Sequence, residues 1–361
     1  MKTKVLMIGN DPSVKGGITS VINQLLDYDW EKENIEMNFV PTYVEGNSIK
    51  KLFIFLKGYV KILKQLSKKE TRPDVVHIHM SYRGSFIRKF AVHKICLKYD
   101  VPDIIHLHGS EFKKWYDSVS DRKKIKIRQL LKESKAFIVL GEKWNKIIKD
   151  IEMETNTVIV SNTVHIPEDK VKWNEPVKIL FLGVLIKRKG VSDLLKAVER
   201  LKKNVDPKKF KVIIAGTGEE EERLKLECKK LNLEKNVEFV GWAAGEKKNK
   251  LLRNSQILVL PSYNEGLPIA ILEAMSYGMP IVTCDVGDIS SAVHDGENGF
   301  LLQPGDVVKM SKSLEKLVGD EKVYTIMAEK SRQIAVEEFN DLNYFEKIRK
   351  TYLRCSTGGT E

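Results

Sequence analysis

Short apolar runs rich in β-branched residues alternate with helical patterns along most of the chain. The runs contain no alternation of apolar and polar positions, which is typical of strands covered on both faces of a parallel sheet. In the first half the predicted strands are residues 4–9, 74–80, 103–109, 136–141 and 156–162. In the second half they are residues 177–185, 210–216, 237–242, 255–262 and 280–285. Strands that alternate with helices predict βαβ units, so we expect an α/β fold.

The chain divides into two halves at residues 165–176, a polar, proline-bounded segment without hydrophobic periodicity. Such a segment is typical of a linker. Its position in a chain of 361 residues predicts two doubly wound, Rossmann-like domains at residues 1–168 and 169–339. Doubly wound domains bind ligands at the carboxyl ends of their strands, where the strand order reverses. We therefore expect two domains that face a central cleft, lined by residues that directly follow strands.

The composition is strongly basic, with 61 Lys and Arg against 49 Asp and Glu and a net charge of +12. This balance indicates an anionic partner, which can be nucleic acid, an anionic membrane surface or a phosphorylated ligand. Nucleic acid is disfavoured because the sequence contains no recognition module or aromatic platform. The absence of a long apolar stretch and the wide spacing of the four cysteines predict a cytoplasmic protein with reduced thiols.

Three glycines follow predicted strands at positions where a ligand can approach the backbone. Gly16 and Gly17 open a helix whose free amides favour an anion, with a simple turn as the alternative. This turn lacks the glycine pattern of a dinucleotide fingerprint, so a nicotinamide cofactor is not expected. Gly216 follows a strand of the second half and permits close approach of the chain or of a ligand.

A cluster of three cations, Lys187, Arg188 and Lys189, stands between a predicted strand and Gly190, which opens the next helix. Cations at the carboxyl end of a strand suit a diphosphate. The alternative is a solvated basic turn in a lysine-rich protein, and the cluster alone does not separate the two.

Histidines occupy alternate positions at the ends of two predicted strands of the first half. His77 and His79 end one strand, and His106 and His108 end the next. No carboxylate or cysteine stands beside them at ligand spacing, so no metal site is expected. We expect His108 to hydrogen-bond to a polar ligand in the cleft and the other three to be packed.

Two glutamates eight positions apart, Glu265 and Glu273, flank a Gly-Leu-Pro sequence. The proline suits the first position of a helix, which places Glu265 in the preceding loop and Glu273 on the helix. The helical rise separates them by roughly 12 Å, too far for both carboxylates to act on one glycosidic bond. The pair suits two separate groups of one long ligand, with the Gly266 and Leu267 amides between them for an anion. Hydroxyls on either side of phosphates are the layout of a sugar nucleotide.

The segment EGLPIAILEAMSYGMPIVTCDVGDISSAVHDGENGFLLQPGD, which starts at Glu265, resembles the retaining family 4 glycosyltransferases of bacteria. The resemblance covers nearly the whole chain and implies the GT-B fold. It implies transfer of a sugar, with retention, from a nucleotide-sugar donor, by family habit a UDP-sugar. The implied acceptor is a saccharide or polyprenyl-linked saccharide in surface polysaccharide assembly, and no metal or other cofactor is expected. The resemblance also implies that residues 340–361 form a helix that crosses back to the first domain, and a tail.

The resemblance assigns roles to the motif residues. Glu265 would contact hydroxyls of the donor sugar, and Glu273 would contact those of the ribose. The amides of Gly266 and Leu267, together with Lys189, would hold the diphosphate. These groups would stabilise the charge that develops on the leaving nucleotide diphosphate.

Residues of the first domain complete the implied donor site. The Gly16–Gly17 loop would close on the phosphates, and His108 would lie near the donor sugar. One position departs from the family, which usually has an arginine where this chain has Val184. Lys187 or Arg188 is then the candidate source of the missing charge.

Residues 49–69 contain seven lysines and no acidic residue. On a helical wheel one wide apolar face is formed by Leu52, Phe55, Leu56, Tyr59, Val60, Ile62, Leu63 and Leu66. The opposite face carries Lys50, Lys57, Lys61, Lys64 and Lys68. Such a helix lies in an anionic membrane interface or packs on a core with a solvated lysine face. Further basic residues at 83–100 favour the membrane, and hence a peripheral location on the inner face of the plasma membrane.

Two other functions remain open at this point. An isomerase of nucleotide sugars on the same fold would need acid–base groups, for which His77, His79 and His106 are the candidates. A non-catalytic nucleotide-sugar-binding partner subunit is the other, because Val184 replaces an expected phosphate ligand.

Overall fold

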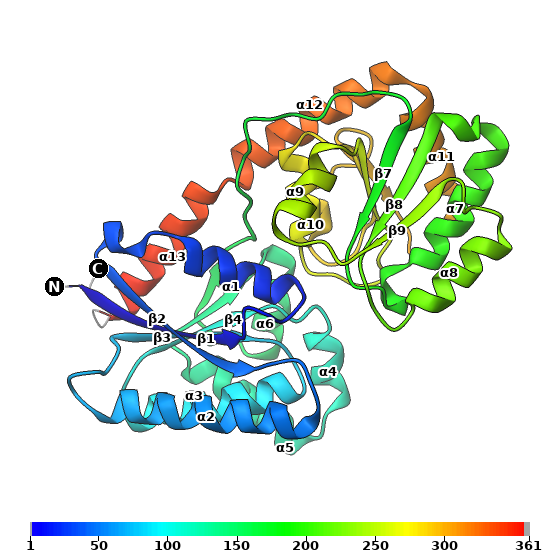
Figure 1. The fold of residues 1–361 in the computed structure, drawn as a ribbon. Helices are drawn as coiled ribbons and strands as arrows, with labels where there is room; N and C mark the ends of the chain where they lie inside the picture. Colours follow the sequence, from blue (N-terminus) through cyan, green and yellow to red (C-terminus); the bar gives the residue numbers. More distant parts are fainter. Residues whose placement is uncertain (1, 357–361) are drawn as a thin grey trace. The chain divides into compact units, whose positions relative to one another are not determined.

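The computed structural model describes residues 2–356, which form two six-stranded parallel sheets, each covered by helices on both faces (Figure 1). The chain separates into two compact units. The first unit comprises the residues up to Ser161 together with those from Leu342 onward, and the second comprises Asn162–Asp341. The predicted tail at residues 357–361 lies outside the described residues. The predicted α/β fold with two doubly wound sheets is confirmed.

The sheet of the first unit has the order β2-β1-β3-β4-β5-β6, so the winding direction reverses between β1 and β3. Its strands are β1 (Thr3–Asn10), β2 (Ile35–Tyr43), β3 (Val75–Met80), β4 (Asp103–Leu107), β5 (Ala136–Val139) and β6 (Thr157–Ile159). Its helices are α1 (Gly17–Asp27), α2 (Ser48–Ser67), α3 (Gly84–Lys98), α4 (Phe112–Ser118), α5 (Asp121–Glu133), α6 (Glu142–Ile151) and α13 (Asp341–Ser356). Figure 1 shows α1 and the red helix α13 on one face of this sheet, and α2 and α3 on the other.

The sheet of the second unit has the order β12-β11-β10-β7-β8-β9, so the winding direction reverses between β7 and β10. Its strands are β7 (Val177–Leu182), β8 (Phe210–Ala215), β9 (Val237–Gly241), β10 (Ile257–Leu260), β11 (Ile281–Cys284) and β12 (Gly299–Leu302). Its helices are α7 (Val191–Asn204), α8 (Glu221–Lys230), α9 (Gly245–Arg253), α10 (Ile269–Ser276), α11 (Val307–Gly319) and α12 (Glu321–Glu338).

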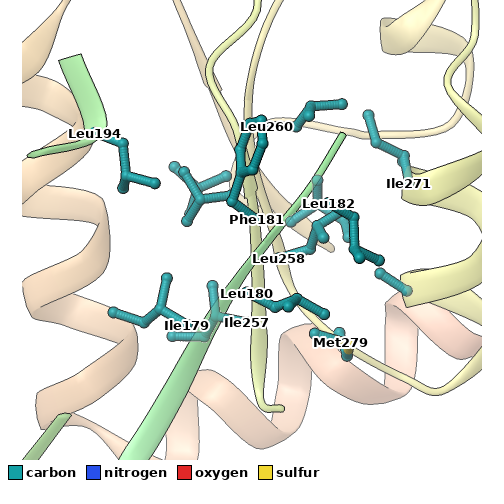
Figure 2. Packing of buried hydrophobic residues seen from close by; sticks show 14 of the residues in the cluster. Ile179, Leu180, Phe181, Leu182, Leu194, Ile257, Leu258, Leu260, Ile271 and Met279 are labelled. Atoms are coloured by element: carbon teal, nitrogen blue, oxygen red, sulfur yellow. The ribbon is translucent and has the colours of Figure 1, made fainter. Parts of the chain in front are cut away.

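The central strand β7 shows why the apolar runs do not alternate with polar residues. Phe181 and Leu182 are both buried, although successive side chains of a strand point to opposite faces. In Figure 2, Phe181 lies on the side of Leu194 from α7, whereas Leu182 lies toward Ile271 from α10. Both faces are therefore core, and each fully buried side chain of this kind stabilises the fold by about 1.5–3 kcal/mol.

The prediction missed two strands, β2 and β12, each of which lies at one of the two edges of its sheet. The sequence of β2, IEMNFVPTY, mixes exposed and buried positions and contains Pro41. Proline is tolerated only where a ladder hydrogen bond is absent, as at an edge or a bulge, and the register with β1 shifts at this point. The strand β12, GFLL, begins with a glycine and lies between the turn-like segments DGEN and QPGD, which are typical of loops and obscure its short apolar run.

Candidate functional site

The reversal of strand order in the second sheet brings together the loops that follow β7 and β10, which are neighbours in that sheet. The loop after β7 contains a 3-10 helix, η2 (Lys187–Lys189), and the loop after β10 contains Glu265. Open α/β sheets bind ligands at such a reversal. The candidate site of the second unit therefore lies where the fold class expects one.

A close backbone contact fixes the first loop against the second. Gly190 has φ 70°, and a Cβ atom placed on it would lie 2.0 Å from the carbonyl oxygen of Pro261. Only glycine satisfies both the left-handed conformation and this contact. The amide of Tyr263 donates to the carbonyl of Arg188 at 2.8 Å, so the cationic turn and the Glu265 loop are bound backbone to backbone.

Glu265 is held between two cations. Its carboxylate forms an ion pair through Oε1 with Lys189 Nζ, and Oε2 lies 3.8 Å from a guanidinium nitrogen of Arg188. The same guanidinium donates to the carbonyl of Asn264 at 2.7 Å. The Glu265 side chain is only 10% exposed, so a nearly buried carboxylate is fixed in place and its charge is balanced.

The carbonyls of Gly266 and Leu267 accept hydrogen bonds within the second unit. The Gly266 carbonyl accepts from the amide of Asp288 at 3.0 Å, and the Leu267 carbonyl accepts from the Asn162 side chain at 2.6 Å. Within residues 2–356, neither of the two amides donates a hydrogen bond. Free amides next to a helix N-terminus suit an anion. The helix α10 begins at Ile269, because Pro268 is its N-cap and not its first residue, one position later than predicted.

The second glutamate of the motif, Glu273, lies on α10 and pairs with Lys248 of α9. Its side chain is 17% exposed. The two glutamates therefore have separate cationic partners, consistent with two separate roles. Lys248 was not identified from the sequence, because it is one of several charged residues at the start of α9 and nothing in the sequence shows which of them pairs with Glu273.

The other predicted donor-site positions of the second unit have clear structural explanations. A Cβ atom on Gly216 would lie 1.8 Å from the carbonyl oxygen of Gly183, so this glycine permits close packing of the loops after β7 and β8. Val184 precedes the cationic turn, in which Lys187 is exposed and Arg188 is partly buried. Of the two candidate replacements for the missing arginine, only Arg188 lies beside Glu265.

The first unit contains a layer of hydrogen-bonded imidazoles on neighbouring strands β3 and β4. His77 Nδ1 lies 2.7 Å from the hydroxyl of Tyr352, and His77 Nε2 lies 3.2 Å from His106 Nδ1. His79 Nδ1 lies 2.9 Å from Nε2 of His108. The first three histidines are buried and His108 is partly exposed, so the prediction that three are packed is confirmed.

Burial makes these imidazoles neutral. Desolvation lowers the pKa of His77 and of His108 to about 3, and it lowers the pKa of His79 and His106 well below the usual value. One potential ligand atom from each of His77, His79 and His106 lies within 4.8 Å of the others. Neutral imidazoles are the form that binds a metal, so these three residues are the group that could hold one.

Gly16 and Gly17 lie at the N-terminus of α1, directly after β1. Gly16 is the N-cap residue and has φ 136°, a conformation that other residues rarely adopt. A Cβ atom on either glycine would meet nothing within 4 Å. The space beside this turn is open, and the backbone conformation is what requires glycine.

The amphipathic helix α2 differs from its prediction in one respect. Its apolar residues do not form one face, because Ile62 and Leu66 are buried while five others are between 47% and 79% exposed. The exposed residues, here named the α2 stripe, are Ile49, Leu52, Phe53, Leu56 and Val60. Residues three and four apart share a helix face, so the α2 stripe lies between the buried face and the exposed Lys50, Lys57, Lys61, Lys64 and Lys68.

No helix within residues 2–356 has both the length and the apolar character needed to cross a membrane. All four cysteines are free and buried, as expected for reduced thiols.

Comparison with known proteins supports the assignment from the site. The model of the family "Glycosyl transferases group 1" matches residues 165–334. An uncharacterized glycosyltransferase of Haemophilus influenzae is 36% identical over 200 residues, a match that spans 54% of this chain and 55% of that protein. The Escherichia coli UDP-Gal:alpha-D-GlcNAc-diphosphoundecaprenol alpha-1,3-galactosyltransferase is 26% identical over 352 residues, covering 90% of this chain and 85% of that protein.

The fold has close relatives among solved structures. Sucrose-phosphate synthase of Thermosynechococcus elongatus superposes with a TM-score of 0.82 at 16% identity, covering 99% of this chain and 100% of that one. The alternatives of an isomerase or a silent partner subunit receive no support from these matches. These matches support a glycosyltransferase with the GT-B fold, in which residues 165–334 match the group 1 glycosyl transferase family.

Proposed function

We propose that the protein is a retaining family 4 glycosyltransferase that uses a UDP-sugar donor and a lipid-linked diphosphosaccharide acceptor in surface polysaccharide assembly. The observation that carries the donor side is the pair of unoccupied amides beside the Glu265–Lys189 ion pair. The name of the Escherichia coli relative supports both the UDP-activated donor and the diphosphoprenyl acceptor.

The donor would lie across the carboxyl edge of the second sheet. The Gly266 and Leu267 amides, Arg188 and Lys189 bind the diphosphate, while Glu265 accepts hydrogen bonds from sugar hydroxyls. Because Lys189 and the amides are already in position, they stabilise the negative charge that develops on the leaving diphosphate without reorganisation. This positive charge comes from the protein, so we propose that donor binding does not require a metal.

Glu273 would accept hydrogen bonds from the ribose hydroxyls, and Lys248 holds its carboxylate in position before the donor arrives. In the first unit, the open Gly16–Gly17 turn suits a phosphate and the partly exposed ring of His108 suits a sugar hydroxyl.

The contacts of the Glu265 carboxylate support the proposed retention. Glu265 is engaged by two cations, which suits hydroxyl binding and weakens it as a nucleophile. We therefore propose that the acceptor hydroxyl attacks the anomeric carbon on the face from which the diphosphate leaves. The new bond joins the acceptor oxygen to the anomeric carbon, the sugar–phosphate bond breaks, and a diphosphate oxygen takes the acceptor proton.

The α2 stripe and its flanking lysines would place the protein on an anionic membrane surface. Exposed apolar side chains beside a row of lysines combine burial in the headgroup region with attraction to anionic lipids. This location would bring the enzyme to a lipid-linked acceptor and favours the inner face of the plasma membrane.

A thermal-shift panel tests the donor assignment. UDP, GDP, ADP and UDP-sugars are compared with and without magnesium, on the wild type, Glu265→Gln and the exposed control Glu222→Gln. A ligand at about 100 times its Kd stabilises by nearly 3 kcal/mol, and we expect uridine nucleotides to do so without metal. UDP-sugar should lose most of its shift in Glu265→Gln only. A wild type that no nucleotide stabilises would contradict the proposal, and conversion of the donor without acceptor would indicate an isomerase.

A further inference from the structure

The first unit contains a buried lysine without a counter-ion. Lys89, on α3, is 1% exposed, and its ammonium donates one hydrogen bond, to the hydroxyl of Thr42. That hydroxyl in turn donates to the carbonyl of Gly9 at 3.2 Å. Within residues 2–356, Lys89 forms no other hydrogen bond and no ion pair. An ammonium group has three donors, so two of them are unused in a site from which water is nearly excluded.

A second cation, Arg88, is the neighbouring residue and also has an unused hydrogen-bond donor. Arg88 is partly buried, and its Nε atom is buried without a hydrogen-bond partner. Its guanidinium carbon lies 5.0 Å from the centre of the Tyr43 ring, and Lys51 Nζ lies 5.7 Å from the same ring. Neither Arg88 nor Lys51 has a carboxylate partner among the described residues.

These cations gather at the carboxyl ends of β1 and β2, beside the reversal of strand order between β1 and β3. Thr42 and Tyr43 end β2, Gly9 lies near the end of β1, and both strands are neighbours. This is the edge at which a doubly wound sheet binds ligands. A buried charge without a partner is costly. Burial, and to a smaller extent the nearby charge of Arg88, lowers the pKa of Lys89 to about 7. An anion at this position would therefore use the free donors and balance the charge of this cluster.

We propose that Lys89 and Arg88 bind a phosphate group of the lipid-linked acceptor. Phosphate oxygens accept from the unused ammonium and guanidinium donors, and charge-assisted bonds of this kind are the strong ones. Lys51 belongs to α2, whose exposed apolar stripe begins at Ile49, so a prenyl chain attached to the phosphate would continue into the membrane. The assignment to the acceptor rests on the function proposed above, whereas the anion site itself does not.

The test is calorimetric titration of the full-length chain, held in saturating UDP, with inorganic pyrophosphate and with farnesyl diphosphate. Saturating UDP occupies the donor site, so that only a second site is observed. The wild type is compared with Lys89→Met, which keeps the length of the side chain, and with Arg88→Gln. Lys98→Gln is the matched control, because Lys98 is on the same helix and also lies over a tyrosine ring.

We expect both diphosphates to bind the wild type and the control equally, and the affinity of both site variants to fall by about tenfold or more. We expect Lys89→Met to unfold at the same temperature as the wild type or higher, since it removes a buried uncompensated charge. If Lys89→Met does not fold, Arg88→Gln, altered at a partly exposed position, decides the result.

Two results would overturn the proposal: no diphosphate binding in saturating UDP, or equal binding by the wild type and both site variants. Tight binding of pyrophosphate with no binding of farnesyl diphosphate would overturn the lipid assignment. Failure of UDP to bind, with pyrophosphate binding still dependent on Lys89, would contradict the proposed donor function and leave the anion site in place.

Discussion

The carboxyl edges of the two sheets differ in whether their cations have acidic partners. In the second unit the buried or partly buried cations of the site have acidic partners, with Lys189 and Arg188 beside Glu265 and Lys248 on Glu273. In the first unit Lys89 and Arg88 have none, and the nearby histidines are neutral. A site whose cations are paired with carboxylates is organised before its ligand arrives. A site whose cations have no such partner is stabilised when an anion binds. The difference indicates that the two edges bind different reactants, the donor at the second sheet and the acceptor phosphate at the first.

The largest expected effect comes from removing the balancing cation of the second unit. Lys189→Met takes away charge stabilisation of the leaving diphosphate, and the loss of one such donor costs about 10²–10³-fold in kcat. Steady-state transfer assays should show this loss, while Lys187→Met, at the exposed neighbouring position, should remain close to wild type. Equal activity of the two variants would show that the ion pair is structural only.

The next effect concerns the backbone contact that brings Lys189 to Glu265. Gly190→Ala introduces a Cβ atom 2.0 Å from the Pro261 carbonyl in a left-handed conformation. We expect it to lower the free energy of unfolding by about 2–4 kcal/mol, measured by urea denaturation. Gly319→Ala, where a Cβ atom meets nothing within 4 Å, is the control and should unfold like the wild type.

A pH titration sharpens the comparison on the first unit. The folded pKa of Lys89 is lowered to about 7, below its unfolded value, so between pH 7 and that value the unfolded chain binds more protons. Stability relative to Lys89→Met should therefore rise with pH from about 7 upward, with a slope of at most about 1.4 kcal/mol per pH unit. Arg88 on the same helix stays charged, and His79 on β3 stays neutral, across this range.

The control for this titration is Lys98→Met, which should show the pH dependence of the wild type. Saturating pyrophosphate should flatten the slope, because an anion favours the charged amine. A slope that is the same in the wild type and in Lys89→Met would contradict the buried, uncompensated state of this lysine.

The smallest expected effect is on membrane binding. The double variant Phe53→Ser, Leu56→Ser removes two side chains of the α2 stripe and should weaken binding to anionic phosphatidylglycerol vesicles by about tenfold, at about 0.7 kcal/mol per partly buried side chain. Sedimentation with vesicles measures it. Leu226→Ser, at a residue 62% exposed on α8 of the second unit, is the control. Unchanged binding by the double variant would contradict the proposal that the α2 stripe binds the membrane.

The fold could be predicted because strands buried on both faces leave uninterrupted apolar runs. β2 escaped because it mixes exposed and buried positions and contains Pro41, and β12 escaped because turn-like segments enclose its short apolar run. The Glu265 loop and the cationic turn were recognisable from their order along the chain. Lys248 and Lys89 were not, because a lysine looks the same in sequence whether it is solvated, paired or buried. The division of the apolar residues of α2 into a buried face and an exposed stripe likewise depends on how the helix is rotated against the sheet.

The most direct test of the two-edge account is the stoichiometry of inorganic pyrophosphate binding to the wild-type chain, measured by calorimetry with and without UDP. The account predicts two sites per chain, of which UDP removes one and Lys89→Met removes the other. A single site, or two sites that UDP displaces together, would contradict the claim that the two sheets bind separate phosphate groups.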